Sequence, residues 1–328
     1  MDWVRGQFLG RGNFATVNLA THIKHSLNFS CITAVKSSEE YTSHFLQKEK
    51  HILDRLGSSP YIIKCFGHDH TFEDDQECYN IFLEYAVGGT LFDQLKNHGD
   101  KFSETLVRRY TRSIVEGLKH IHESGFVHCD VKLQNILVFD QGNVKISYFG
   151  LAKVEGLEHG EKKLKCRVTP IFMVPESIND SIYESPVDIW ALGCAVVEMI
   201  TGKPTWNMSS KANMWSLKIH IGIGEELPLI PNELSEEGKD FLNKCFVKDP
   251  LKRSSLEMLL KHPFISDDET LLSLKGLINK SQLPLMSPRT HLDYSQWASC
   301  EDFTDEDSNN LLRCYRSKAV RLVSKLEF

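Results

Sequence analysis

Three side chains within one short stretch have the clearest potential for chemistry: Asp130, Lys132 and Asn135. They belong to eight mostly polar residues between the apolar pair at 126–127 and the apolar run at 136–139. The apolar flanks predict short strands, and a loop pinned between strands fixes its side chains while leaving them open to a ligand. Two oxygen-bearing groups with a cation between them could therefore hold a polar reactant. A polar turn without a site is the alternative that these residues alone leave open.

Apolar periodicity predicts the elements that would position this loop. Segment 106–123 is predicted as a helix, because apolar residues recur in it at spacings of three and four: Val107, Tyr110, Ile114, Leu118 and Ile121. Segment 44–56 is predicted as a second helix with an apolar face. That face consists of Phe45, Leu46, Ile52 and Leu53. Asp188 opens a third helix, which is apolar enough to be a core helix.

A glycine-rich turn lies near the start of the chain, at Gly10-Arg11-Gly12-Asn13-Phe14-Ala15, with Thr16 and Val17 after it. Glycines allow the backbone to approach a ligand closely, so that amide groups can cover phosphates. The dinucleotide-binding fold is the competing interpretation, and it requires a helix directly after the turn. Residues 16–20 alternate as a strand does, so we predict strand, turn and strand in this region.

The composition is that of an ordinary soluble protein, with 41% hydrophobic and 25% charged residues among 328. A net charge of −6 gives no reason to expect a nucleic acid or an acidic membrane as partner. Nine cysteines occur without a C-x-x-C pair, which argues against a zinc site and predicts reduced thiols. No apolar run approaches the roughly 20 residues of a membrane span. We therefore expect a cytoplasmic protein, with the nucleus as an alternative location.

The order and spacing of these motifs resemble those of serine/threonine protein kinases over residues 3–264. The loop reads His-x-Asp-x-Lys-x-x-Asn at 128–135, with Cys129 where Arg is usual. The run at 169–176 resembles the segment that forms a shelf for the substrate residue. The resemblance implies an α+β, bilobal protein kinase fold. Its small β-rich lobe with one main helix would occupy about 3–85, and its large, mostly helical lobe about 90–264.

The resemblance implies ATP and Mg²⁺ as cofactors and gives roles to single residues. Asp130 would orient the substrate hydroxyl and accept its proton, and Lys132 would steady the γ-phosphoryl group. Asn135 would hold a magnesium ion. Lys36 would contact the α- and β-phosphates, with Glu49 as its ion-pair partner. The residues implied at the nucleotide site are Leu9, Gly10, Arg11, Gly12, Asn13, Phe14, Ala15, Thr16, Val17, Ala34, Lys36, Glu49, Glu84, Ala86 and Leu137.

Several of these positions are apolar and leave two interpretations open. By the resemblance, Leu83 is the gatekeeper, and backbone groups of Glu84 and Ala86 bond the edge of adenine. Val17 and Leu137 would lie against its ring, as would Ala34. Apolar residues at these places could equally be plain core.

Position 148 departs from the family pattern. The strand at 144–146 is followed by Tyr148-Phe149-Gly150, where the family has Asp-Phe-Gly. The missing Asp is the ligand that bridges magnesium to the phosphates, and a phenol is a poor, mostly neutral substitute. Phe149 and His128 remain for hydrophobic packing. We therefore expect the fold to be kept and the metal chemistry to be altered.

The activation segment, 151–168, contains no Ser, Thr or Tyr. Cys129 also removes the Arg that clamps a phosphate on this segment in many kinases. Activation by phosphorylation within 151–168 is therefore excluded. Three supporting contacts are expected nearby: Thr169 with the catalytic loop, Glu176 with Arg253, and Asp188 with backbone amides of the same loop.

Beyond the kinase-like region the sequence changes character. Residues 266–307 hold nine acidic and three basic residues, which predicts a mostly disordered acidic linker over 265–307. Residues 308–328 predict a basic amphipathic helix, because apolar and basic residues alternate there with helical spacing. Such a helix would dock on its own kinase domain or bind a partner.

Within the protein kinases, the sequence looks most like the plant mitogen-activated protein kinase kinase kinases of the MEKK-like group. Segments 3–6, 128–130, 190–199 and 234–242 carry this likeness. The expected function is an ATP-dependent serine/threonine protein kinase whose substrate is a mitogen-activated protein kinase kinase. The alternative, which Tyr148 favours, is a catalytically impaired pseudokinase that acts as a scaffold for nucleotide or partner proteins.

Overall fold

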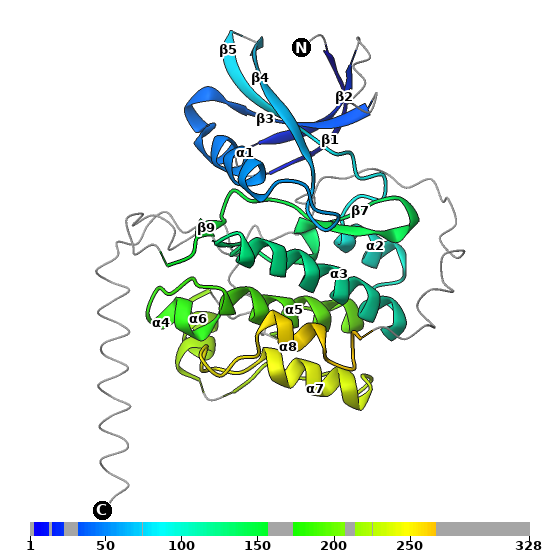
Figure 1. Cartoon of the computed structure of the whole chain (residues 1–328), viewed down its shortest axis with the longest axis vertical. Coiled ribbons are helices and arrows are strands. Elements are labelled where there is room, and N and C mark those ends of the chain that lie inside the picture. Colours follow the sequence, from blue (N-terminus) through cyan, green and yellow to red (C-terminus); the bar gives the residue numbers. More distant parts are fainter. Residues whose placement is uncertain are drawn as a thin grey trace, which may run out of the picture. The chain divides into compact units, whose positions relative to one another are not determined.

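Figure 1 shows the chain as a computed structural model, which describes residues 3–12, 15–22, 32–73, 75–156, 173–206, 214–224 and 226–266. All of these residues belong to one compact unit, which spans residues 1–290. Of the linker predicted over 265–307, residues 267–307 lie outside the described residues, as do the predicted helix at 308–328 and Thr169, whereas Ile265 is buried in the core. None of the helices that the structure describes is long and apolar enough to cross a membrane.

The first part of the chain forms an antiparallel five-stranded sheet in the order β1-β2-β3-β5-β4 (Figure 1). Its strands are β1 (Trp3–Arg11), β2 (Thr16–His22), β3 (Ile32–Glu39), β4 (Cys65–Glu73) and β5 (Gln76–Leu83). β2 follows the glycine-rich turn directly, which confirms the predicted strand and excludes the dinucleotide-binding interpretation. β3 is the central strand and is buried from 33 to 38, so it carries Lys36 into the interior.

One main helix, α1 (His44–Leu56), follows a single turn of 3₁₀-helix, η1 (Glu40–Thr42), and packs beside β4 and β5. The predicted bounds of 44–56 are confirmed. Glu49 lies on the buried face, because residues three and four apart share one side of a helix. The apolar residues of that face are Leu46, Ile52, Leu53 and Leu56. Phe45 was expected there but is half-buried, since neighbouring residues are about 100° apart around a helix.

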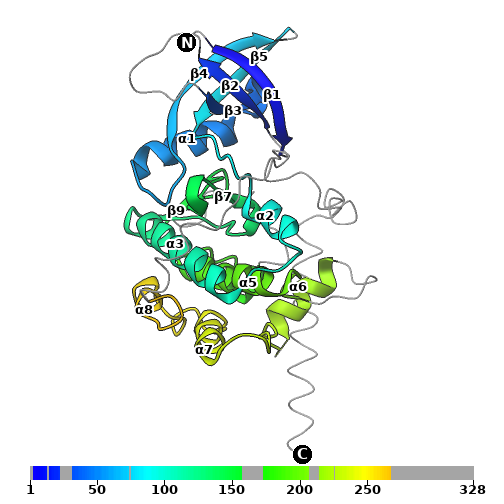
Figure 2. The ribbon, with the colours of Figure 1, turned by 90° about the vertical axis from the view of Figure 1, so that its right-hand side faces the viewer.

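The second part of the chain is mostly helical. Its helices are α2 (Leu91–Asn97), α3 (Glu104–Glu123), α4 (Pro175–Asn179), α5 (Pro186–Thr201), α6 (Met214–Ile223), α7 (Glu236–Cys245) and α8 (Leu256–Leu260). α3 lies beside α5 and α8, as Figure 2 also shows. α5 is buried along nearly its whole length, so it is the core helix that its apolar sequence predicts.

Short strands and 3₁₀ turns complete this part and hold the catalytic loop. β6 (Phe126–Val127) pairs with β9 (Lys153–Val154), and β7 (Ile136–Val138) pairs with β8 (Val144–Ile146). The 3₁₀ turns are η2 (Leu133–Asn135) and η3 (Asp140–Gly142).

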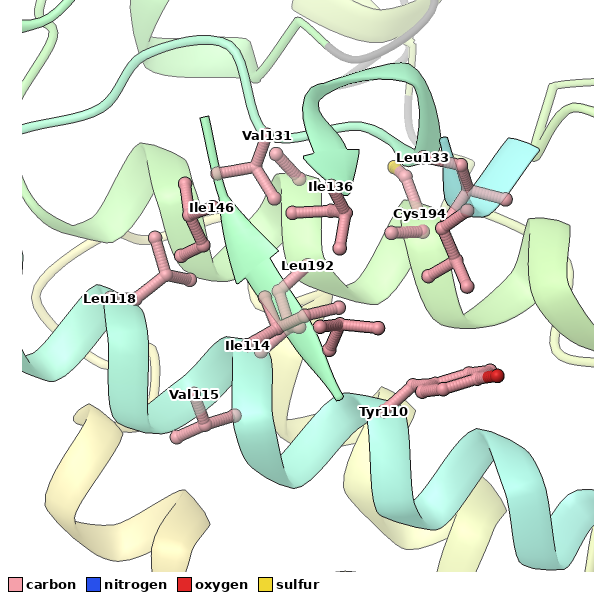
Figure 3. Close-up of a cluster of buried hydrophobic side chains, with 14 of the residues drawn as sticks. Tyr110, Ile114, Val115, Leu118, Val131, Leu133, Ile136, Ile146, Leu192 and Cys194 are labelled. Carbon is pink, nitrogen blue, oxygen red and sulfur yellow. The ribbon is translucent and has the colours of Figure 1, made fainter. Parts of the chain in front are cut away.

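Figure 3 shows how the loop is anchored from below. Val131 and Leu133 point into a hydrophobic cluster with Leu118 of α3 and Leu192 of α5. The loop alternates apolar and polar residues from Asp130 onward, so that burial of the apolar ones fixes the polar ones between them.

Candidate active site

Asp130, Lys132 and Asn135 lie together in the loop between β6 and β7. The Lys132 ammonium donates to one carboxylate oxygen of Asp130 at 2.8 Å, and the Asn135 amide donates to the other at 2.7 Å. Asn135 also donates to the backbone carbonyl of Asp130 at 2.7 Å. These bonds fix the Asp130 carboxylate in the wall of the cleft, where it can orient a substrate hydroxyl and accept its proton.

Asp188, at the start of α5, anchors the backbone of the catalytic loop. Its carboxylate accepts hydrogen bonds from the backbone amides of His128 at 2.8 Å and Cys129 at 2.9 Å, which confirms the predicted contact. It also accepts from the His122 ring at 2.9 Å. Burial alone would raise the pKa of Asp188, but the bond from His122 and the amide of His128 outweigh it and lower that pKa. Asp188 is therefore a charged structural anchor.

Cys129 occupies the position at which the family usually has Arg. Its backbone is left-handed, with φ of 63°, an uncommon conformation for a residue with a side chain. Burial, and then the neighbouring Asp188 carboxylate, raise the pKa of the Cys129 thiol well above its usual value. The thiol therefore stays protonated and supplies no charge that could clamp a phosphate.

Lys36 and Glu49 form the predicted ion pair between β3 and α1. The Lys36 ammonium lies 2.5 Å from a carboxylate oxygen of Glu49, and both residues are buried. The ammonium also lies over the ring of Tyr148, 3.6 Å from its centroid. A cation this close to a ring face is attracted by the ring's π electrons. Lys36 is therefore held from two sides, one of which the sequence did not reveal.

A cleft of about 580 Å³ lies between the sheet and the loop that follows β5. Six apolar residues of the sequence-based set line it: Leu9, Val17, Ala34, Leu83, Ala86 and Leu137. Glu84 lines it as well. An apolar slot of this kind, next to backbone groups at the end of a strand, fits a flat heteroaromatic base. Ile63, Tyr85 and Ser147 also line the cleft and had no distinguishing signal in the sequence.

A second cavity of about 500 Å³ continues toward the catalytic loop. Gly12 and Ala15 of the glycine-rich turn line it, as does Asp130. The Gly12 amide donates to the Ala15 carbonyl at 2.7 Å and closes the turn. Gly10 and Arg11 pair with Val17 and Thr16 at the base of this turn, whereas residues 13 and 14 lie outside the described residues. Phe45 and Leu46 also line this cavity, and sequence reasoning had not placed them at the site.

The ligands for a metal ion are fewer than the family pattern implies. The side-chain oxygen of Asn135 is buried and has no hydrogen-bond partner within the described residues, so it can ligate a cation. At position 148 a phenol ring replaces the expected carboxylate. The described part of the chain holds no group of three or more His, Cys, Asp or Glu side chains that could bind a metal. Among the described residues, Asn135 would therefore be the side chain that holds a magnesium ion, and the ion would supply charge neutralisation next to the phosphates of a nucleotide.

A smaller pocket of about 320 Å³ lies on the other side of Asp130. Met173, Val174 and Tyr183 line it, together with Val131 of the catalytic loop. Arg253 donates to both carboxylate oxygens of Glu176, at 2.7 and 3.2 Å, which confirms the predicted pair. This buried pair supports the shelf and takes no part in chemistry.

Comparison with known proteins agrees with this geometry. Residues 3–265 match the protein kinase domain family. Mitogen-activated protein kinase kinase kinase 20 of Arabidopsis thaliana is 47% identical over 91% of this chain and 89% of its own length. Kinase kinase kinases 17 and 18 of the same plant are 39% and 38% identical, over 98% and 99% of this chain and 87% and 93% of their own lengths.

The chain therefore belongs to the protein kinase family. Within that family it is a serine/threonine protein kinase of the plant mitogen-activated protein kinase kinase kinase type. The alternative of a pseudokinase scaffold is not supported by these comparisons, because the relatives carry the names of kinases.

Proposed function

We propose that this chain transfers the γ-phosphoryl group of ATP to a serine or threonine of a mitogen-activated protein kinase kinase. The arrangement of Asp130, Lys132 and Asn135 carries this proposal, because it places a proton acceptor beside a cation at a cavity that Lys36 and the glycine-rich turn also line. The names of the similar plant proteins support the class of substrate.

Each residue has a distinct task in this reaction. Asp130 receives the hydrogen bond of the substrate hydroxyl and takes its proton as the new O–P bond forms, while the bond from the γ-phosphorus to the bridging oxygen breaks and ADP leaves. Lys132, 2.8 Å from that carboxylate, lies where it can also meet the negative charge of the transferring group. Lys36 and the amides of the glycine-rich turn hold the remaining phosphates. Magnesium, when bound beside Asn135, supplies further charge neutralisation.

The pocket beside Asp130 supports a preference in the substrate. Its lining is mostly apolar, and Met173 and Val174 are both buried. An apolar side chain next to the acceptor hydroxyl would fill it and exclude water from the reacting oxygen. We expect an acidic residue at that substrate position to be disfavoured, because no described lysine or arginine lines this pocket.

Radiolabelled phosphate transfer tests the proposed function directly. The full chain is incubated with labelled ATP, magnesium and a mitogen-activated protein kinase kinase made inactive by replacement of its own catalytic lysine. Incorporation into serine or threonine is expected, and Asp130→Asn should remove it, because an amide cannot take the proton. Nucleotide binding without any incorporation would favour the scaffold.

We also propose the cytoplasm as the location, with the nucleus as a second compartment. The five described cysteines have free thiols, which supports a reducing environment. Imaging of a fluorescent fusion in plant cells would test this, and confinement to a secretory compartment would contradict it.

A further inference from the structure

Tyr148 and Lys36 form the contact in the cleft that departs most from the family pattern. The Lys36 ammonium lies 3.6 Å from the Tyr148 ring centroid and 2.5 Å from a carboxylate oxygen of Glu49. An aromatic ring holds a cation without neutralising it, whereas a carboxylate would do both. The ring therefore positions the ammonium without adding a second negative charge beside that of Glu49.

The ring lies where the two cavities of the cleft adjoin. Tyr148, Lys36 and Glu49 line both the cavity of about 580 Å³ and the one of about 500 Å³. A nucleotide that places its base in the first cavity and its phosphates toward the glycine-rich turn must pass this point. The side chain at position 148 would therefore lie next to the polyphosphate of a bound nucleotide, because it lines both cavities.

The charges around the cleft balance without an ion. Among the described residues, each carboxylate that lines the two cavities is paired with a lysine. The pairs are Glu49–Lys36, Asp130–Lys132 and Glu84–Lys145. A fourth carboxylate, at position 148, would give this set a net charge of −1 and would repel a polyphosphate until a cation neutralised it. Tyr148 removes that repulsion together with the metal ligand.

We propose that Tyr148 is a nucleotide-positioning residue that makes binding of ATP to this cleft independent of a divalent metal. The ligand is the metal-free nucleoside triphosphate anion, held by Lys36, the amides of the glycine-rich turn and the apolar slot for the base. This inference rests on the proposed function, in which ATP is the phosphoryl donor. It concerns binding, while magnesium can still enter with Asn135 for the transfer step.

Isothermal titration calorimetry on the full chain tests this, with ATP as the probe in either excess magnesium or excess chelator. The two dissociation constants are expected to agree within about three-fold. A weakening of about tenfold or more on chelation would overturn the proposal.

Three variants separate the effects of the ring, the hydroxyl and the charge. Tyr148→Asp should bind ATP at least about tenfold more weakly in chelator than in magnesium, because it restores the repulsion. Tyr148→Leu keeps the neutral site without the ring, and should bind about five-fold more weakly in both conditions. Tyr148→Phe keeps the ring and the neutral site, so its dissociation constants in magnesium and in chelator should agree within about three-fold. Unchanged affinity in Tyr148→Leu would show that the ring does not position Lys36.

Thermal unfolding without nucleotide provides the folding control. If Tyr148→Leu does not fold, the comparison of Tyr148→Phe with Tyr148→Asp still decides whether charge sets the metal dependence. The proposed function fails separately: metal-independent binding without phosphoryl transfer would overturn only the kinase reaction. Metal-dependent binding with transfer would overturn only this inference.

Discussion

At position 148 the backbone conformation suits an Asp, whereas the side chain is a phenol that cannot replace a carboxylate as metal ligand. The Tyr148 φ of +69° lies in the left-handed region, which Asp adopts at lower cost than a bulky aromatic residue does. The next residue, Phe149, is fully buried. Its ring packs edge to face against the His128 ring, with the two ring centroids 5.1 Å apart. Neighbouring packing therefore retains the turn after β8, and within that turn the change lies in the side chain at 148.

Replacing Tyr148 by Asp should raise phosphoryl transfer at saturating magnesium and ATP by roughly 100-fold, since a charged ligand would then position the ion. Initial rates with the natural chain and the variant measure this. Asp130→Asn in the Tyr148→Asp background should abolish the gain, which ties it to this site. Equal rates for the natural chain and Tyr148→Asp would mean that another group holds the ion.

At the scale of elements, α5 shows how partners decide the charge of a buried carboxylate. Asp188, in its first turn, meets two backbone amides and His122, and its pKa is lowered. Glu198, near its other end, has one carboxylate oxygen without a hydrogen-bond partner among the described residues. Burial raises the pKa of Glu198 to about 7, although Lys96 and Lys132 oppose the shift. The same helix thus carries a charged anchor and a carboxyl that favours its neutral form.

Glu198 should make the stability of the fold depend on pH. Below pH 4.5, the ordinary pKa of a glutamic acid, Glu198 is protonated in both the folded and the unfolded chain, so its burial carries no cost of ionisation. As pH rises toward 7 the unfolded chain ionises first, and stability falls until the folded pKa is passed. Glu198→Gln should therefore stabilise the protein by about 3 kcal/mol near pH 8 and by nothing near pH 4.

Urea denaturation of the two proteins at several pH values measures this difference. Glu236→Gln is the matched control, because it makes the same change of charge at a side chain that is 89% exposed. The control should show no comparable rise with pH. A Glu198→Gln effect of the same size near pH 4 and near pH 8 would mean that packing, and not ionisation, is responsible.

The activation segment leads to a prediction about regulation. Residues 151–168 contain no Ser, Thr or Tyr, and Cys129 supplies no cation for a phosphate. Phosphatase treatment should therefore leave activity unchanged through this segment. Mass spectrometry combined with rate measurements tests the neighbouring Thr169. A phosphate on Thr169 that raises activity would contradict its assignment to the substrate shelf.

At the scale of the whole molecule, the nucleotide cleft depends on both parts of the kinase domain. Leu9, Val17 and Ala34 come from the sheet, whereas Leu137 and Tyr148 come from the segments around β7 and β8. Backbone bonds join the parts, such as the Ile63 amide to the Ile146 carbonyl at 2.9 Å. The cleft therefore exists only when sheet and helical part fold against each other.

Removal of residues 267–328 should leave this assembly intact, because the described residues already form the hydrophobic core and line the cleft. Thermal unfolding and ATP titration of the shortened chain test this, with the full chain as reference. A melting temperature close to that of the full chain is expected. A fall on the order of 10 °C would show that the tail completes the core.

The sequence by itself determined the elements and the catalytic loop. Alternation predicted β2, helical spacing predicted α1 and α3, and the loop residues Asp130, Lys132 and Asn135 follow from a local pattern. Local patterns suffice there because secondary structure and loop chemistry depend on residues close in sequence. Only the tertiary structure showed that Ile63 and Phe45 line the nucleotide cleft and that the ring of Tyr148 lies against the Lys36 ammonium. Those contacts join segments far apart in the chain, and only packing of the sheet on the helical part brings them together.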